Sequence, residues 1–341
     1  MSGEIGFGIV GAGMVARYHA RALAATRGAR LVAICRAEAS RAAEISAELG
    51  VPCAASFEAL LDHPGVDAIC LCTPSGLHAD QAQAAARAGK HVLVEKPMAL
   101  DLADADRMIA ACRVAGVRLG VVLQRRTDPA LVELHDAIRA GELGRLVLAT
   151  ATVPYFRPPS YYDSAAWRGT WSLDGGGALM NQGIHLVDLL LWLMGGEAEV
   201  VGASGGTSVH DIEVEDCVVA ALRFPDGARG SIVATTAAAP GFPHRLEVYG
   251  SAGGAQLEGE TLVRWEGAAP RIRAAKPTPQ SAGAGGSPAG IDTLGHTRIL
   301  QDFVAAIRAG REPLVDGSAG RRSLALVLAI YEAAGLAGGR R

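Results

Sequence analysis

A lysine in the segment Glu95-Lys96-Pro97-Met98 is the first side chain suited to moving a proton. A lysine that is partly desolvated near a cation has a lowered pKa and can accept a proton from a hydroxyl group. A surface ion pair between Glu95 and Lys96 is the alternative. Pro97 argues against that pair, because it biases Lys96 toward an extended conformation at the end of an apolar strand. We therefore predict that Lys96 is catalytic.

A polar stripe on an apolar segment carries the second candidate. Asn181, His185 and Asp188 are four and three residues apart, so on a helix running to about Met194 they share one face. Buried polar groups at helical spacing need partners, and three of them favour a cleft against the first domain over a plain core. A histidine satisfied within the core is the alternative, and the glycines at 175–177 favour a site. We predict that His185 is catalytic and binds substrate together with Asn181.

A glycine-rich turn near the start of the chain has the spacing of a dinucleotide site. Gly11, Gly13 and Ala16 give the GxGxxA pattern, directly after the apolar run from Ile5 to Val10 and before an alanine-rich helix. Missing side chains allow the backbone to approach a pyrophosphate, and the helix N-terminus supplies positive potential. We expect the backbone around this turn to bind the cofactor, through the residues Gly11, Gly13, Met14 and Val15.

The end of the second strand, after Cys35, is where NAD enzymes usually hold the ribose with a carboxylate. This chain has Arg36 there instead. Its guanidinium can pair bidentately with a 2′-phosphate, with Ser40 and Arg41 as helpers, and this favours NADP over NAD. The alternative is that Arg36 is a solvated surface residue and that Glu38 takes the ribose.

Two further loops belong to the predicted cofactor site, because they follow strands at the carboxyl edge of a parallel sheet. Thr73, Pro74 and His78 lie in the loop after the strand at 66–72, and Glu95 and Lys96 end the next strand. A histidine at a helix start is also a common polar cap, so the role of His78 is left open between cofactor contact and capping.

Several polar and aromatic side chains precede the polar stripe and can stack on a sugar or hydrogen-bond to it. The predicted substrate-binding residues among them are Arg157, Trp167 and Arg168, with Tyr161 and Tyr162 as further candidates. Ordinary loop packing is the alternative for each of them. Arg168 is favoured because it adjoins the glycine-rich turn.

The pattern around these residues predicts an α/β protein of two domains. Strands and helices alternate up to the strand at 117–123, which indicates a Rossmann doubly wound parallel sheet. From 145 to 258 six β-runs with partial period-two alternation indicate an α+β domain on a largely antiparallel open sheet. We expect a dinucleotide-binding domain at 1–124 and a substrate-binding and oligomerisation domain at 125–341, with a mobile loop at 267–290 and closing helices at 298–309 and 323–336.

Composition limits the function classes. The 341 residues are 50% hydrophobic with a formal net charge of −3, which leaves no basic surface typical of nucleic-acid binding. The start of the chain lacks a secretory pattern and the apolar runs are too short to span a bilayer, so we expect a cytoplasmic protein without membrane contact. The six cysteines form no zinc-type cluster, and we expect no metal.

The glycine turn, the Thr73-Pro74 loop and Glu95-Lys96-Pro97-Met98 together resemble the Gfo/Idh/MocA oxidoreductase family over essentially the whole chain. The resemblance implies a catalytic role for Lys96, a substrate helix with His185, and a homodimer or homotetramer through the open sheet face. Some members have an aspartate where this chain has Asn181, so proton transfer is left to Lys96 or His185. The form Met-Asn-Gln-Gly-Ile-His at 180–185 is similar to dehydrogenases that oxidise C3 of a UDP-linked sugar acid.

The combined prediction is an NAD(P)-dependent oxidoreductase that moves a hydride between the nicotinamide and a secondary alcohol or ketone carbon of a sugar, polyol or nucleotide sugar. Lys96 takes or gives the hydroxyl proton, and His185 holds or relays it. Two alternatives stay open. One is a glycoside hydrolase that retains its cofactor and oxidises C3 transiently, and the other is a non-catalytic sugar or nucleotide sensor.

Overall fold

The chain forms two compact units, and a computed structural model describes residues 3–267 and 293–336. The first unit comprises Met1–Thr127 and Asp292–Arg321, and the second comprises Asp128–Ile291 and Arg322–Arg341. The sequence analysis divides the chain once, after residue 124. The structure differs because helix α9 (Leu294–Ala309) packs on α1 (Met14–Ala25) and completes the first unit.

The first unit is built on a six-stranded parallel sheet with the order β3-β2-β1-β4-β5-β6. This order and the parallel pairing confirm the predicted Rossmann sheet. Because both faces are covered, the strands are almost entirely buried. The strands are β1 (Ile5–Val10), β2 (Ala29–Cys35), β3 (Cys53–Ala54), β4 (Ala68–Leu71), β5 (His91–Val94) and β6 (Leu119–Val121).

The helices of the first unit follow the strands in the alternating order that the sequence predicts. Side-chain caps fix two of their starts: Ser56 accepts a hydrogen bond from the Ala59 amide, and Asp101 accepts one from the Asp104 amide. Besides α1 and α9, the helices are α2 (Ala42–Leu49), α3 (Phe57–Leu61), α4 (His78–Arg87) and α5 (Leu102–Ala115), with short 3₁₀ turns η1 (Ala39–Arg41), η2 (Ser75–Leu77) and η3 (Gln124–Thr127).

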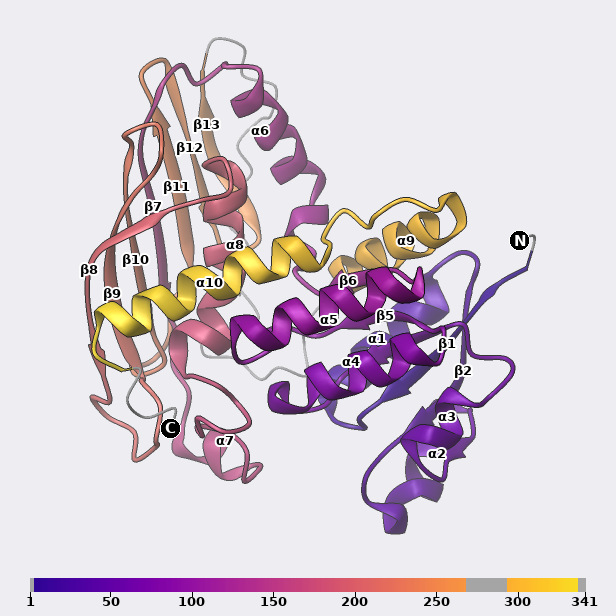
Figure 1. Ribbon diagram of the computed structural model, residues 1–341. Helices are drawn as coiled ribbons and strands as arrows, with labels where there is room; N and C mark the ends of the chain where they lie inside the picture. The colour runs from indigo at the N-terminus through magenta and orange to yellow at the C-terminus, as the bar shows by residue number, and fades with distance from the viewer. Residues whose placement is uncertain (1–2, 268–292, 337–341) are drawn as a thin grey trace. The chain divides into compact units, whose positions relative to one another are not determined.

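The second unit is built on a seven-stranded sheet with the order β13-β12-β11-β7-β10-β9-β8 (Figure 1). Only β7 and β10 pair in parallel, so the prediction of a largely antiparallel sheet is confirmed. The edge strand β13 was not expected. The strands are β7 (Leu146–Pro154), β8 (Glu199–Gly206), β9 (Cys217–Arg223), β10 (Arg229–Thr235), β11 (Arg245–Gly250), β12 (Gly253–Glu258) and β13 (Thr261–Glu266).

Helix α8 (Ile184–Leu193) packs on β7 and β11 of this sheet (Figure 1). Nearly all of its residues are buried, which explains why it is apolar on almost every side. The one-residue alternation of β7, with Ala149, Ala151 and Val153 buried, leaves the other face of the sheet more exposed. The remaining helical elements are α6 (Pro129–Arg139), α7 (Pro159–Asp163), the π-helix η4 (Ala178–Gly183) and α10 (Gly317–Ala333).

Two further expectations concern segments near the end of the chain. The loop expected at 267–290 lies, apart from its first residue, outside the described residues. Helix α10 begins at Gly317, six residues before the expected start, and the boundary between the units falls within it. In the part of the chain that the structure describes, no helix has the length and apolar character needed to cross a membrane.

Candidate active site

The turn between β1 and α1 has the backbone of an anion site. Gly11 has φ +100°, and a Cβ atom there would lie 2.5 Å from the Cys72 carbonyl oxygen, so only glycine fits. Gly13 caps α1 without a side-chain hydrogen bond, and a Cβ atom on it would meet no atom within 4 Å. The first amides of α1 therefore adjoin open space, and the residues present fit a dinucleotide pyrophosphate.

Arg36, at the end of β2, is largely buried, with 12% of its side chain exposed. Its Nη2 lies 2.6 Å from Oε2 of Glu38, and its buried Nε has no acceptor among the described residues. Arg41 is exposed and bidentately paired with Glu44, while Ser40 is exposed. The structure thus brings Arg36 and Glu38, the two alternatives for the ribose site, into one ion pair.

His78 connects the loops that follow β4 and β5. Its side chain is fully buried, with Nδ1 at 2.9 Å from the Pro97 carbonyl oxygen and Nε2 at 3.0 Å from the Thr73 carbonyl oxygen. Burial lowers the pKa of His78, so the neutral ring has one N–H and donates to one of the two carbonyls. Both ring nitrogens thus face carbonyl oxygens of the first unit, and the predicted cofactor contact of His78 stays a prediction.

Glu95 is buried against two histidines from distant parts of the chain. Its Oε1 lies 2.8 Å from Nε2 of His19 on α1 and 3.8 Å from Nε2 of His296 on α9, and its Oε2 accepts a 3.3 Å hydrogen bond from the Lys96 amide. Glu95 thus braces the backbone of Lys96, which is half-buried after β5 and precedes a cis peptide to Pro97.

The charges in this buried group are fixed by the contact between Glu95 and His19. Burial would raise the pKa of Glu95, but the hydrogen bond and charge of His19 outweigh it and lower the pKa to about 2. Burial would lower the pKa of His19, yet its surroundings, with the Cys72 and Cys70 thiols beside it, raise that pKa well above the usual value. Burial raises the pKa of the Cys72 thiol to about 11, so Cys72 is uncharged at neutral pH and Glu95 is the anion facing the imidazolium.

The same three side chains are the one group in the described chain with the composition of a metal site, since their ligand atoms all lie within 4.8 Å of one another. Two ligands of a tetrahedral zinc ion at its usual bond lengths stand about 3.3 Å apart. The 2.8 Å contact between His19 and Glu95 is shorter and matches a charged hydrogen bond. Burial and the charge of His19 lower the pKa of His296 to about 4, so it completes the group as a neutral ring.

In the second unit, Glu215 holds the start of the π-helix η4. Its carboxylate accepts hydrogen bonds from the amides of Gly177 (2.7 Å) and Leu179 (2.8 Å), and its carbonyl oxygen accepts one from the Ala178 amide (3.0 Å). The Tyr331 hydroxyl donates to Glu215 at 2.8 Å and accepts from the next amide of η4. A Cβ atom on Gly177 would lie 1.7 Å from the Glu215 carbonyl oxygen, which explains the glycine. The amide of the capping residue Gly177 and the first three amides of this helix are thereby satisfied.

The predicted polar stripe begins in η4 and continues in α8. Asn181 donates a 2.8 Å hydrogen bond to Asp174, and His185 is half-buried one turn later. Asp188 is buried and accepts a 2.8 Å hydrogen bond from the Ser323 hydroxyl of α10, so it fastens two helices of the second unit. Asn181 and His185 remain the members of the stripe with a predicted role in substrate binding.

The predicted substrate residues before the stripe form one cluster around Tyr161. The guanidinium carbon of Arg168 lies 4.4 Å from the ring centroid of Tyr161 and 4.6 Å from that of Trp167, and Nη1 donates a 2.7 Å hydrogen bond to the Tyr161 hydroxyl. The guanidinium carbon of Arg157 lies 5.4 Å from the same Tyr161 centroid. Gln182 of η4 also donates to the Tyr161 hydroxyl at 3.3 Å. The structure therefore gathers Arg157, Trp167 and Arg168 beside η4.

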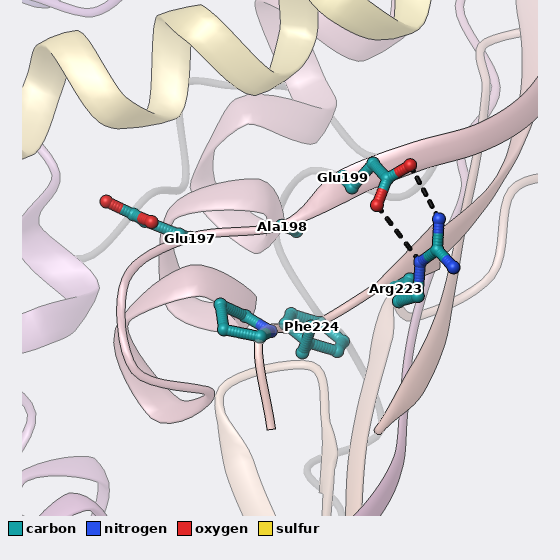
Figure 2. Close-up of a pocket in the computed structure, with 6 residues that line it drawn as sticks. Glu197, Ala198, Glu199, Arg223 and Phe224 are labelled. Atoms are coloured by element: carbon teal, nitrogen blue, oxygen red, sulfur yellow. Dashed lines mark hydrogen bonds and ion pairs between the residues drawn. The ribbon is translucent and has the colours of Figure 1, made fainter. Parts of the chain in front are cut away.

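A pocket elsewhere in the second unit contains none of the predicted residues. Its lining comes from 197–199, at the start of β8, and from 223–225, at the end of β9. Figure 2 shows its charged pair, in which the Arg223 guanidinium meets both oxygens of Glu199 at 2.7 and 3.0 Å. The charges of Glu199 and Arg223 neutralise each other, and the remaining carboxylate of the lining, Glu197, is exposed, so we assign this pocket no catalytic role.

Comparison with known proteins identifies the family. Residues 5–123 match the Rossmann part described as an oxidoreductase family with an NAD-binding Rossmann fold, and residues 131–256 match the GFO/IDH/MocA C-terminal domain. The 1,5-anhydro-D-fructose reductase of Ensifer adhaerens is 32% identical over 338 residues, 96% of both chains. The chain belongs to the Gfo/Idh/MocA oxidoreductase family.

Other relatives of this Gfo/Idh/MocA protein include the myo-inositol 2-dehydrogenase of Thermotoga maritima, which is 34% identical over 253 residues, 72% of this chain and 73% of the relative. Among solved structures, the WlbA dehydrogenase of Bordetella pertussis, in complex with NADH and UDP-GlcNAcA, matches with a TM-score of 0.85 and 38% identity, covering 97% of each chain. The predicted enzyme class is therefore confirmed: the protein is an NAD-binding oxidoreductase. The hydrolase and sensor alternatives are not favoured.

The sequence analysis of this Gfo/Idh/MocA protein missed four buried residues that support candidate site segments within their own units: His19, His296, Glu215 and Tyr331. Each acts through a contact with a residue at least 36 positions away, so no local pattern marks it. Neither His19, which has Arg17 and Arg21 nearby, nor Glu215, which lies between Glu213 and Asp216, stands out from its neighbours in the sequence.

Proposed function

We propose that this Gfo/Idh/MocA protein oxidises a secondary alcohol of a sugar, polyol or nucleotide sugar, or reduces the corresponding ketone, with Lys96 as the proton-transfer group. This role is supported by the contact that holds the backbone of Lys96. Its backbone amide is held by the buried carboxylate of Glu95, which is itself fixed by a charged hydrogen bond to His19. Such support fixes the position of a catalytic side chain to the precision that proton transfer requires.

The nicotinamide ring, when bound, supplies the hydride acceptor or donor. The chain supplies the rest. The β1–α1 turn binds the pyrophosphate through backbone amides, and Lys96 takes the hydroxyl proton during oxidation or returns it during reduction. His185 binds a hydroxyl of the substrate or relays its proton, and Asn181, held by Asp174, contacts the sugar.

We further propose that the enzyme prefers NADP over NAD through Arg36. This side chain is held at the end of β2 with its buried Nε unsatisfied in the described chain, and a 2′-phosphate would give it a stronger partner than the exposed Glu38 carboxylate. NAD remains a second cofactor, since Glu38 stands at the usual place of a ribose-binding carboxylate.

Among the substrate classes, we propose a nucleotide sugar first. The observations in favour are the form of the 180–185 segment and the similarity to the WlbA dehydrogenase, whose structure contains UDP-GlcNAcA. The neutral-sugar relatives, such as the myo-inositol dehydrogenase, keep polyols and free sugars as further candidates.

We also propose a cytoplasmic homodimer or homotetramer formed through the exposed face of the second unit's sheet. Leu148 and Val219 are exposed on this face at 38% and 47%, and such apolar side chains on a wide sheet favour burial against a second copy. Light scattering after gel filtration tests the assembly, and a monomer at micromolar concentration contradicts it.

The test of the activity is the absorbance of reduced nicotinamide with NADP or NAD against free sugars, inositols, glycosides and UDP-sugars. The wild type should turn over at least one of them. Lys96→Ala should lower kcat by about 10²- to 10⁴-fold, because general-base assistance contributes about that much. Lys90→Ala is the matched control, since Lys90 binds the Val66 carbonyl at the opposite end of β5. Near wild-type turnover by Lys96→Ala contradicts the assigned role.

A further inference from the structure

The guanidinium of Arg168 is held by two aromatic rings, and one of its buried N–H donors has no acceptor among the described residues. Its guanidinium lies within cation–π distance of both Tyr161 and Trp167, and one N–H is used on the Tyr161 hydroxyl at 2.7 Å. The guanidinium has five N–H donors, and its buried Nε has no acceptor among the described residues. An unsatisfied buried donor is unfavourable, so the arrangement favours a ligand that supplies an acceptor.

No carboxylate of the described chain lies within ion-pair distance of Arg168. The two carboxylate oxygens of the nearby Asp174 accept hydrogen bonds from the Gly169 amide and from the side chain of Asn181. Other arginines of this chain are neutralised: Arg223 meets both oxygens of Glu199 (Figure 2), and Arg321 meets both oxygens of Asp106. Arg168 therefore differs from them in keeping its positive charge available.

A second guanidinium raises the positive potential at the same place. Arg157 lies over the Tyr161 ring that Arg168 also contacts. Burial raises the pKa of Tyr161, so its phenol is uncharged at neutral pH and does not compensate either cation. Two like charges around one neutral ring repel each other, and an anion between them relieves the repulsion.

This cluster is tied to the substrate helix. Gln182 of η4 donates to the same Tyr161 hydroxyl that Arg168 contacts, and the neighbouring Asn181 is fixed by Asp174. A group bound at Arg168 therefore shares its supporting residues with the proposed sugar site of the second unit.

We propose that Arg168 binds an anionic group of the substrate, a carboxylate or a phosphate, through the free edge of its guanidinium. This inference rests on the proposed function, because it names the substrate class of the same site. The planar fork of arginine matches both anions bidentately, and the flanking Tyr161 and Trp167 rings hold that fork in place. The enzyme should accordingly select a sugar acid, sugar phosphate or sugar diphosphate over its neutral counterpart.

The test is a binding measurement that needs no turnover. Quenching of tryptophan fluorescence, to which Trp167 beside Arg168 contributes, is titrated with glucose, glucuronate, glucose 6-phosphate, UDP-glucose and UDP-glucuronate. At least one anionic probe should bind at least tenfold more tightly than glucose. Gain with glucuronate alone identifies a carboxylate, and gain with glucose 6-phosphate or UDP-glucose identifies a phosphate.

Three variants locate the effect. Arg168→Gln should weaken the preferred anionic probe by about 10- to 100-fold and leave glucose within about threefold, as expected for a charged hydrogen-bonded pair. Arg168→Lys keeps the positive charge without the planar pair of donors, so it should lose less affinity for the anionic probe than Arg168→Gln. Arg223→Gln removes an arginine of the second unit outside the cluster and should change neither probe.

The outcomes separate this inference from the proposed function. Equal affinity of the wild type for anionic and neutral probes overturns the inference, and so does an equal loss of both in Arg168→Gln. If Arg168→Gln does not fold, the wild-type comparison and Arg168→Lys still decide. Arg168-dependent binding of an anionic sugar without hydride transfer supports the inference while the proposed function fails. Turnover of neutral sugars without a preference for anionic ones supports the proposed function and contradicts the inference.

Discussion

Replacing Glu215 with glutamine should change how the stability of the second unit depends on pH. Glu215 is 1% exposed and accepts hydrogen bonds from Gly177, Leu179 and Tyr331. Burial raises its pKa to about 7 from 4.5, although the three donors act in the opposite direction. Glutamine keeps the shape and cannot titrate, but its amide nitrogen would face the Gly177 N–H, which costs about 1–3 kcal/mol at every pH.

The pH-dependent part follows from proton linkage. Because the pKa of Glu215 is higher in the folded protein than in the unfolded chain, the native state binds the proton more tightly. This contribution to stability is fully present below pH 4.5 and is lost as pH rises through 7. With these pKa values, the wild type should lose about 2.5 kcal/mol of unfolding free energy between pH 5 and pH 8 relative to Glu215→Gln.

The assay is urea unfolding at pH 5, 6, 7 and 8, followed by tryptophan fluorescence, since Trp171 packs edge-on against Tyr331 at 5.7 Å. The exposed Glu197→Gln serves as the control and should give a flat difference from the wild type. A difference between the wild type and Glu215→Gln that stays constant within about 0.5 kcal/mol from pH 5 to pH 8 refutes the reasoning.

Three other substitutions test contacts described above. Arg36→Asp should weaken NADP by about 10- to 100-fold while NAD changes little, because a charged hydrogen bond to the 2′-phosphate is lost; fluorescence titration measures both, and an unchanged ratio contradicts the cofactor proposal. His19→Leu leaves the carboxylate of Glu95 buried without its charged partner and should cost about 3–5 kcal/mol in urea unfolding; a cost below 1 kcal/mol shows that the pair is dispensable. Ser323→Ala should lower stability by about 1–2 kcal/mol in calorimetry, since Asp188 loses a hydrogen bond from α10, and an unchanged Tm shows that this bond contributes nothing.

The first unit could be predicted closely because its signals are local. Strand β1 begins and ends at the residues expected from the sequence, and the GxGxxA turn follows it directly, as predicted. The start of α10 could not be predicted, since glycine disfavours a helix. Cβ atoms on Gly317 and Gly320 would lie 2.8 and 2.7 Å from Leu119 and Val121, so close packing on the first unit's sheet outweighs helix propensity there.

The residues of the candidate site also differ in whether the sequence reveals them. Lys96 and His185 are recognisable from their own segments, whereas the residues that support them are not. The brace of Glu95 needs His19, 76 residues earlier, and the start of η4 needs Glu215, 36 residues after Leu179. Such contacts depend on the tertiary fold, and a single sequence contains no periodic signal for them.

The division of the first unit into two stretches of chain has a consequence for synthesis on the ribosome. The core around Phe7 includes Leu300 and Phe303 of α9, with the two phenylalanine rings 6.4 Å apart. Translation at about 5–20 residues per second separates residue 127 from residue 321 by roughly 10 to 40 seconds. During that interval α9 is missing, so the apolar side chains of the dinucleotide-binding domain that pack against it are exposed. The protein should therefore engage chaperones that bind exposed apolar surface, and separate expression of residues 1–127 should give an aggregating fragment that a supplied α9 peptide stabilises.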